Sequence, residues 1–281
     1  MSKIQIINTP REIVDSNMDG AVQKANLGLS KMIAMGILAG MFIGVGGAAS
    51  NTAAHSVANV GLARVISGCI FPVGLLMIVL VGAELFTGNC LMIMATMDKR
   101  IRVRLLLRNL IIVFFSNLVG ALIFDVLVFY SGNLNYSDGG LGAYTIKVAL
   151  DKATITPLRG ITSGFLCNFL VCVAILNGAA AREVAGKVMA TWFPIFAFVI
   201  NGFEHIVANM YYIPIGIMAK SNPAYVLKAE ELYGITAKQL EDLSVNGALN
   251  HFIPVTIGNI LGGMFVGFMI YYIHIIFDND Q

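Results

Sequence analysis

The chain reads Gly82-Ala83-Glu84-Leu85-Phe86-Thr87-Gly88-Asn89 inside one apolar run and Gly202-Phe203-Glu204-His205-Ile206-Val207-Ala208-Asn209 inside another. Both strings share the register G-x-E-x-x-x-x-N. A charged side chain inside a membrane span costs about 3 kcal/mol, so its presence at two matching places indicates an internal duplication with a special site in each half. Two interrupted helices at matching places are typical of membrane transporters and channels.

The composition is that of a membrane protein. Hydrophobic residues make up 57% of the chain and charged residues 12%, whereas a soluble domain carries about 25% charged residues. Apolar runs of about 20 residues, the length that crosses a bilayer, recur at Met32–Ser50, Val65–Ala83, Leu110–Tyr130, Ile161–Ala181, Val188–Phe203 and Phe252–Phe277. We therefore predict an all-α membrane protein with six transmembrane helices in one channel domain over residues 31–278.

The duplication extends beyond the two glutamates. The string Gly36-x-x-x-Gly40 in the first span matches Gly160-x-x-x-Gly164 in the fourth, and Asn117-Leu-Val-Gly120 in the third matches Asn259-Ile-Leu-Gly262 in the sixth. Spans one to three therefore correspond in order to spans four to six, with repeat one at about 31–131 and repeat two at about 157–278. Because each repeat has an odd number of spans, the second is inverted relative to the first.

Spans two and five are the interrupted ones. The apolar pieces that follow Glu84 and Glu204 are too short to cross a bilayer alone, and Pro72 and Pro194 are expected to kink the pieces that precede them. Irregular backbone at membrane depth is tolerated only where it is buried in protein or lines a cavity. We expect the two interruptions to face each other across a central passage.

Basic residues predict the orientation. Lys99, Arg100, Arg102, Arg104 and Arg108 lie between spans two and three, with no acidic residue after Asp98. The positive-inside rule places this connection, and with it both termini, in the cytoplasm. The polar connections Ser131–Pro157 and Lys220–Asn250 then lie outside.

Residues 1–30 are predicted to form a cytoplasmic amphipathic helix ahead of the channel domain. The helix would start after Thr9-Pro10, which resembles an N-cap followed by a proline in the first turn. It would lie on the membrane face or against a neighbouring subunit. The polar N-terminus is not typical of a cleavable signal peptide.

His205 is the sharpest candidate for a functional residue, because it lies at an interruption beside a repeated glutamate. It is either a hydrogen-bonded packing residue or a group that holds a proton or an anion. Glu84 and Glu204 are expected to stabilise the interruptions by accepting hydrogen bonds from freed backbone N–H groups. Thr87 caps the second half-helix or lines the passage, and Asn168 anchors an interrupted segment or faces the passage.

Other sites receive less support. Asp125 is expected to reach the membrane interface. The four cysteines form no C-x-x-C pair and are expected to be packing residues, so we predict neither a metal nor another cofactor. The net charge of +2 gives no reason to expect nucleic-acid binding. The alternatives to an anion channel are a channel for a neutral solute, an intramembrane metalloenzyme that uses Glu204 and His205, and a scaffold or sensor without flux.

Four strings resemble the formate/nitrite transporter family. They are Gly82-Ala-Glu-Leu-Phe-Thr87, Leu166-Cys-Asn168, Gly202-Phe-Glu-His205-x-x-Ala-Asn209-Met210 and Ile253-Pro-Val-Thr-Ile-Gly-Asn259. The resemblance runs from the first span to the last. It implies an aquaporin-like six-helix protomer, a homopentamer with one pore in each protomer, and a multi-pass location in the bacterial cytoplasmic membrane.

The resemblance also assigns roles to single positions. Substrate binding falls on His205, Thr87 and Asn168. The inner constriction falls on Phe71 and Leu75, the outer one on Leu85 and Phe198, and the vestibule lysine on Lys152, with Lys147 as the alternative. Glu84, Glu204, Asn89 and Asn209 would stabilise the interruptions.

The function that the resemblance implies is a channel or transporter for small monovalent anions of weak acids. Formate is the first candidate, followed by nitrite and then hydrosulfide. The string Thr87-Gly88-Asn89-Cys90 differs from the Thr-Ser-Thr form of formate channels and favours nitrite or hydrosulfide members, so the substrate stays open within the family. A bare anion crosses apolar constrictions poorly because it loses its water. We expect vestibule charge and half-helix dipoles to draw the anion in, and His205 to supply a proton or to stabilise the anion.

Overall fold

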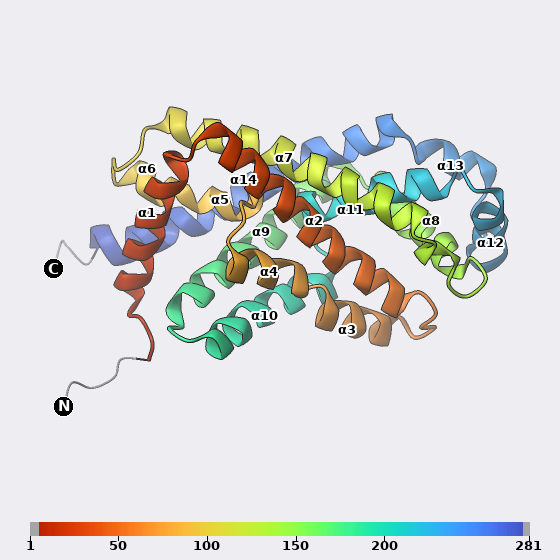
Figure 1. Cartoon of the computed structure of the whole chain (residues 1–281), viewed down its shortest axis with the longest axis horizontal. Coiled ribbons are helices and arrows are strands. Elements are labelled where there is room, and N and C mark those ends of the chain that lie inside the picture. The colour runs from red at the N-terminus through yellow and green to blue at the C-terminus, as the bar shows by residue number, and fades with distance from the viewer. Residues whose placement is uncertain (1–5, 278–281) are drawn as a thin grey trace.

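The computed structural model describes residues 6–277, and the ends of the two predicted regions, residues 1–5 and residue 278, lie outside them. Six helical spans cross the molecule, as predicted (Figure 1). They are α2 (Leu29–Ala54), α3 (Val60–Ile70) with α4 (Val73–Val81), α7 (Val103–Tyr130), α9 (Pro157–Ala180), α10 (Val184–Asn201) and α14 (Val245–Tyr271), which continues as the π-helical η3 (Tyr272–Phe277). Each span begins before its predicted start, because polar residues that flank the apolar run continue the helix.

Both predicted interruptions are present. The helix α4 ends at Val81, and Gly82 has a φ of 86°, which a residue with a side chain rarely adopts. The chain restarts as α5 (Phe86–Asn89), η1 (Cys90–Met92) and α6 (Ile93–Met97). In the second repeat, α10 ends at Asn201, Gly202 is left-handed, and α11 (Ile206–Ala219) follows.

The two prolines before the interruptions behave differently. Pro72 separates α3 from α4, as expected of a proline in a helical span. Pro194 lies inside α10, and the helix continues through it to Asn201.

Glycines bring the long helices of each repeat into backbone contact. A Cβ on Gly120 of α7 would lie 1.9 Å from the carbonyl oxygen of Ile37 in α2, and one on Gly262 of α14 would lie 2.2 Å from the carbonyl oxygen of Phe165 in α9. Small residues that allow such an approach are the usual means of helix association in membranes.

The predicted register of the first and fourth spans is wrong by one helical turn. Asn117 donates its side-chain N–H to the carbonyl oxygen of Gly36, and Asn259 donates the equivalent bond to Gly164. Gly36 therefore corresponds to Gly164, and not to Gly160. In the observed register Gly40 corresponds to Asn168, so the Gly-x-x-x-Gly strings of the two spans do not coincide.

The N-terminal helix is part of the duplicated fold. The helix α1 (Pro10–Ala25) begins with a capping box between Thr9 and Glu12, and its buried face, which includes Val14 and Met18, joins the core of its own protomer. Its counterpart is α8 (Gly140–Ala153), which is largely buried. The prediction of a polar connection between spans three and four is therefore wrong over α8.

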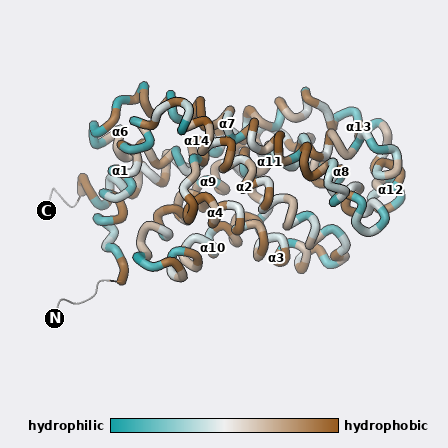
Figure 2. The backbone as a smooth tube through the Cα atoms, in the orientation of Figure 1, coloured by the Kyte–Doolittle hydropathy of each residue, from teal (hydrophilic) through white to brown (hydrophobic). Residues whose placement is uncertain are grey.

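Polar segments lie at the two ends of the molecule. Figure 2 shows hydrophilic residues around α1 and α6 at one end and around α12 (Pro223–Tyr233) and α13 (Ala237–Asp242) at the other, with hydrophobic residues between them. A second hydrophobic cluster joins α8, α11 and α12 at the α13 end. This layer covers the end of α7.

The packing of α7 against α2 and α11 explains a wrong prediction for Asp125. Its side chain does not reach an interface but is completely buried, and neither carboxyl oxygen has a hydrogen-bond donor among the described residues. A carboxyl group without a donor in such a place is stable only in its neutral form.

We predict that Gly120→Ala and Gly262→Ala each lower the free energy of unfolding by about 2 kcal/mol, because the added methyl group meets a backbone carbonyl that cannot move alone. Thermal unfolding of the purified protein in detergent would measure the loss as a lower Tm. Gly20→Ala is the control, since no atom lies within 4 Å of its Cβ position in α1. Equal Tm values for all three variants would contradict this account of the packing.

Candidate functional site

The centre of the site is a hydrogen bond between the two interrupted segments. His205 Nε2 lies 2.9 Å from Thr87 Oγ1, and both side chains are buried. Thr87 lies in the first turn of α5, and His205 is the N-cap residue of α11. The N-termini of both half-length segments therefore meet at this pair, as predicted for interruptions that face each other.

The contacts of the imidazole define its protonation state. The backbone N–H of Ala208 donates to His205 Nδ1 at 3.0 Å, so Nδ1 carries no hydrogen in this arrangement. The single hydrogen of the neutral ring is then on Nε2 and points to Thr87 Oγ1. Thr87 uses its oxygen as the acceptor and keeps its own hydroxyl hydrogen available, while no side chain caps α5, so the capping role considered for Thr87 is excluded.

Apolar side chains enclose the pair. The ring of Phe198 stacks on His205 with centroids 6.0 Å apart, and Phe71 meets Phe198 edge-on at 5.6 Å. Leu75 and Leu85 are also buried. Phe71 and Phe198, assigned to different constrictions by the family resemblance, are thus in direct contact, and the passage is closed at this point.

Asparagines from the third and sixth spans satisfy the freed backbone groups. Asn117 Oδ1 accepts from the N–H of Phe86 at 2.9 Å, and Asn259 Oδ1 accepts from the N–H of Ile206 at 2.8 Å. Their amide nitrogens donate to the carbonyl oxygens of Glu84 and Glu204, each at 2.9 Å. The expectation that the glutamate carboxylates accept these backbone N–H groups is wrong, since asparagine offers a donor and an acceptor at once.

The carboxylate of Glu84 instead binds side chains. Lys24 Nζ lies 3.0 Å from Glu84 Oε1, and Asn89 Nδ2 donates to Glu84 Oε2 at 2.7 Å. Asn109 Nδ2 donates to the same oxygen at 3.3 Å. A buried carboxylate with a cation and two donors avoids most of the cost of an isolated charge.

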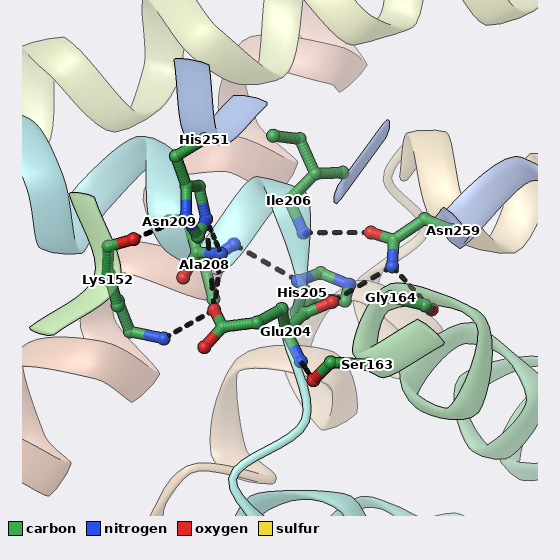
Figure 3. Close-up of polar contacts among 10 residues, drawn as sticks. All are labelled: Lys152, Ser163, Gly164, Glu204, His205, Ile206, Ala208, Asn209, His251 and Asn259. Atoms are coloured by element: carbon green, nitrogen blue, oxygen red, sulfur yellow. Dashed lines mark hydrogen bonds and ion pairs between the residues drawn. The ribbon is translucent and has the colours of Figure 1, made fainter. Parts of the chain in front are cut away.

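The second repeat contains the equivalent cluster (Figure 3). Lys152 Nζ and Asn209 Nδ2 both donate to Glu204 Oε2 at 2.8 Å. His251 replaces Asn109, with Nε2 2.6 Å from Asn209 Nδ2 and Nδ1 2.7 Å from the carbonyl oxygen of Lys152. Because its Nε2 accepts a hydrogen bond, His251 is a neutral ring that donates from Nδ1.

Asn168 holds the interrupted segments together. Its amide nitrogen donates to the carbonyl oxygen of Thr87 at 3.1 Å and to that of Asn259 at 2.6 Å. Of the two roles considered for Asn168, these contacts are those of an anchor. The substrate-binding role that the resemblance assigns to it stays a prediction.

Four residues of the site were not predicted from the sequence. Lys24, Asn109 and His251 complete the carboxylate clusters, and the correspondence between the third and sixth spans could have found the last two, since each lies eight residues before the repeated asparagine. Arg64 of α3 was also missed. It is exposed, and a Cβ on Gly202 would lie 2.8 Å from its Nη1.

Arg64 differs from Lys152 and Lys147, the two candidates for the vestibule lysine, because it has no acidic partner among the described residues. Lys152 is neutralised by Glu204, and Lys147, the other candidate, pairs with Asp151 at the surface. Arg64 has no hydrogen bond or ion pair among residues 6–277. It therefore carries an uncompensated positive charge beside Gly202, at the interruption in the second repeat.

Metal ligation has no support in the described part of the chain, where no three His, Cys, Asp or Glu side chains are grouped as ligands. The cysteines in this region are free. The buried histidines and glutamates are used by hydrogen bonds to asparagine, threonine and lysine.

Six membrane spans, an inverted repeat and two half-length segments that meet at a closed polar pair define a transport protein of the membrane-channel class. The family model described as formate/nitrite transporter matches residues 11–273. The chain belongs to the formate/nitrite transporter family.

Individual relatives agree with this assignment. The chain is 36% identical to a probable formate transporter of Methanothermobacter thermautotrophicus over 90% of its own length and 91% of the relative. Its structure is similar to a pentameric formate channel with formate bound, with a TM-score of 0.77, 29% identity, and coverage of 88% and 97% of the two chains. An aquaglyceroporin from Plasmodium falciparum matches with a TM-score of 0.52 and 11% identity over 90% of this chain and 100% of that one, which confirms the aquaporin-like fold.

We predict that Asn117→Ala and Asn259→Ala each reduce the free energy of unfolding by at least ~2 kcal/mol. Each variant leaves the buried N–H of Phe86 or Ile206 and the buried carbonyl oxygen of Glu84 or Glu204 without this partner, and one such group costs about 1–3 kcal/mol. Thermal unfolding would measure both. Asn201→Ala is the control, because this exposed asparagine only bonds one turn back in its own helix. If Asn259→Ala had the same Tm as the wild type, Asn259 would not be needed to hold the second interruption.

Proposed function

We propose that this protein is a channel for small monovalent anions of weak acids, with formate as the first candidate. The observation that carries the proposal is the buried pair of Thr87 and His205. The pair lies where two helical N-termini meet, and N-termini carry partial positive charge. An anion that arrives there finds donors but no carboxylate, because the interruption glutamates are held by lysines.

His205 acts as a hydrogen-bond donor in this proposal. Protonation of its Nδ1 would break the bond from the N–H of Ala208 and remove a cap from α11. We therefore favour a neutral imidazole that donates from Nε2 to Thr87 while the hydroxyl hydrogen of Thr87 meets the anion. Transfer of a proton to the substrate would require the Ala208 contact to open first, because Nδ1 has to take up a proton when Nε2 gives one away.

The closed passage requires movement. Only 3% of the surface of His205 is exposed. Phe198 stacks on its ring, and Phe71 packs against Phe198. A small planar ion needs the least displacement of these rings, which favours formate and nitrite over larger carboxylates. The names of the relatives described above also favour formate, and nitrite and hydrosulfide are the second candidates.

The wider setting belongs to the same proposal. We propose a homopentamer in a bacterial cytoplasmic membrane, with both termini inside and without chemical conversion of the solute. The support is the similarity to a pentameric channel, the multi-pass helical fold and the basic connection between spans two and three. The assigned inner and outer constrictions, and the boundary of the channel domain near residue 31, remain predictions.

The proposal is tested by flux into proteoliposomes with formate, nitrite and hydrosulfide in parallel, using wild type and His205→Asn. Asparagine is a good N-cap and keeps a donor, but it does not titrate. We expect His205→Asn to transport with a pH profile that follows only the neutral fraction of the acid, which falls about tenfold for each pH unit above the pKa of the acid.

His55→Asn is the matched control, since His55 lies at the end of α2 and contacts Ser137. It should keep the wild-type profile. If His205→Asn also keeps that profile, the imidazole has no role in the pH dependence. If the wild type carries none of the three solutes, the channel proposal itself fails.

Arg64→Gln should lower the flux of anions about threefold at concentrations below saturation, because a nearby uncompensated charge raises the local anion concentration. The difference should shrink in high salt, which screens exposed charges. The comparison variant is Lys147→Gln, which also removes a positive charge but from a surface ion pair. Equal losses in both variants, or a loss that salt does not reduce, would remove Arg64 from the mechanism.

A further inference from the structure

A basic cavity lies at the α1 and α6 end of the molecule, away from the Thr87–His205 pair. Its volume is about 400 Å³, and Asn26 and four arginines line it together with Ile101 and Leu105. The arginines are Arg100, Arg102, Arg104 and Arg108. No step of the transport proposal uses this cavity.

Two of the four arginines are committed to protein partners. Arg100 bonds to Asp98, Asp19 and Asp15 at 2.6, 2.8 and 3.2 Å. Burial raises the pKa of Asp98, but the bonds from Arg100 and Tyr271 outweigh this effect and hold that pKa below its usual value. Arg100 is therefore more than neutralised and does not attract an anion.

Arg108 holds the end of α1. Its guanidinium donates to the carbonyl oxygens of Ala25 at 3.4 Å and Leu27 at 3.2 Å. These contacts use the last turn of α1 and the turn into α2, and they bring the guanidinium to the wall of the cavity beside Asn26. The neutral carbonyls leave its positive charge uncancelled.

Arg102 and Arg104 are exposed, and neither has a hydrogen bond or ion pair within residues 6–277. Arg102 is also the N-cap residue of α7, and no side chain caps that helix. Three positive charges and an uncapped helix start thus surround one cavity. This set fits a phosphate group, which arginine binds through paired N–H bonds.

The exposed surface of α7 next to the cavity is apolar. On the face of α7 that continues from Arg104, Leu107, Ile111 and Phe115 are 50%, 57% and 59% exposed. These residues follow at helical spacing into the part of α7 that spans the membrane. A ligand with a phosphate at the cavity and hydrocarbon along α7 matches both parts.

We propose that Arg102, Arg104 and Arg108 bind the phosphate of an anionic membrane lipid whose acyl chains lie along α7. Anionic lipids are recognised by basic pockets at the cytoplasmic ends of membrane helices. Because Arg108 also holds the end of α1, the bound lipid stabilises the position of that helix. The same helix carries Lys24, which pairs with Glu84 at the first interruption.

The test is thermal unfolding of the full-length protein in detergent, titrated with phosphatidylglycerol, with phosphatidylcholine, or with glycerol phosphate. At a lipid concentration about tenfold above Kd we expect phosphatidylglycerol to raise the Tm by about 3 °C. Phosphatidylcholine and glycerol phosphate should give no shift. The response to phosphatidylglycerol should decrease in high salt.

The variant R102Q/R104Q should lose the shift, while K228Q/K238Q, which removes two charges from the α12 and α13 end, should keep it. Arg104→Lys retains the charge and should keep part of the shift even if the double variant is unstable. Equal shifts with both lipids, an undiminished shift in R102Q/R104Q, or an equal shift with glycerol phosphate would overturn the proposal. This readout does not depend on transport, so it is separate from the failure of the channel function.

Discussion

The structure depends on satisfying backbone groups at two helix interruptions inside a membrane. Lipid offers no hydrogen bonds, so each freed N–H and C=O needs a protein partner. Asn117 and Asn259 provide the same three contacts in the two repeats. Without them the half-length segments could not begin in the interior. Their N-termini, and with them Thr87 and His205, are placed by these two side chains.

The buried charged side chains also need partners inside the protein. Glu84 is paired with Lys24, and Glu204 with Lys152. Each lysine lies in the last turns of a helix, α1 or α8, that stands outside its repeat's three spans. This explains why both repeats carry an additional helix, because a buried carboxylate without a cation would be strongly destabilising. It also means that Lys24 and Lys152 add little net charge to the passage.

Different residues at the centre of the passage serve anion binding and the opening of the passage. Thr87 and His205 are sealed by Phe71 and Phe198, while the donors that would meet an anion are already oriented by Ala208 and by Asn168, which holds the Thr87 carbonyl. Ordered donors need no rearrangement when the solute arrives. The aromatic side chains are then the parts that have to move.

The sequence by itself determined the six spans, the two interruptions and the inversion of the second repeat. These features follow from hydrophobicity, from the cost of a glutamate in an apolar run, and from an odd number of spans, all of which can be read along the chain. The match of Asn117 with Asn259 was visible too, although its purpose was not.

Only the tertiary structure decided which groups become partners. It matched Gly36 with Gly164 and not with Gly160, because the hydrogen bonds from Asn117 and Asn259 define the register and the glycine spacing does not. It also buried Asp125 in the part of α7 that packs against α2 and α11. The lysine partners of the glutamates were set by helices far away in the chain, since hydrogen bonds and ion pairs depend on distances in space that no local pattern contains.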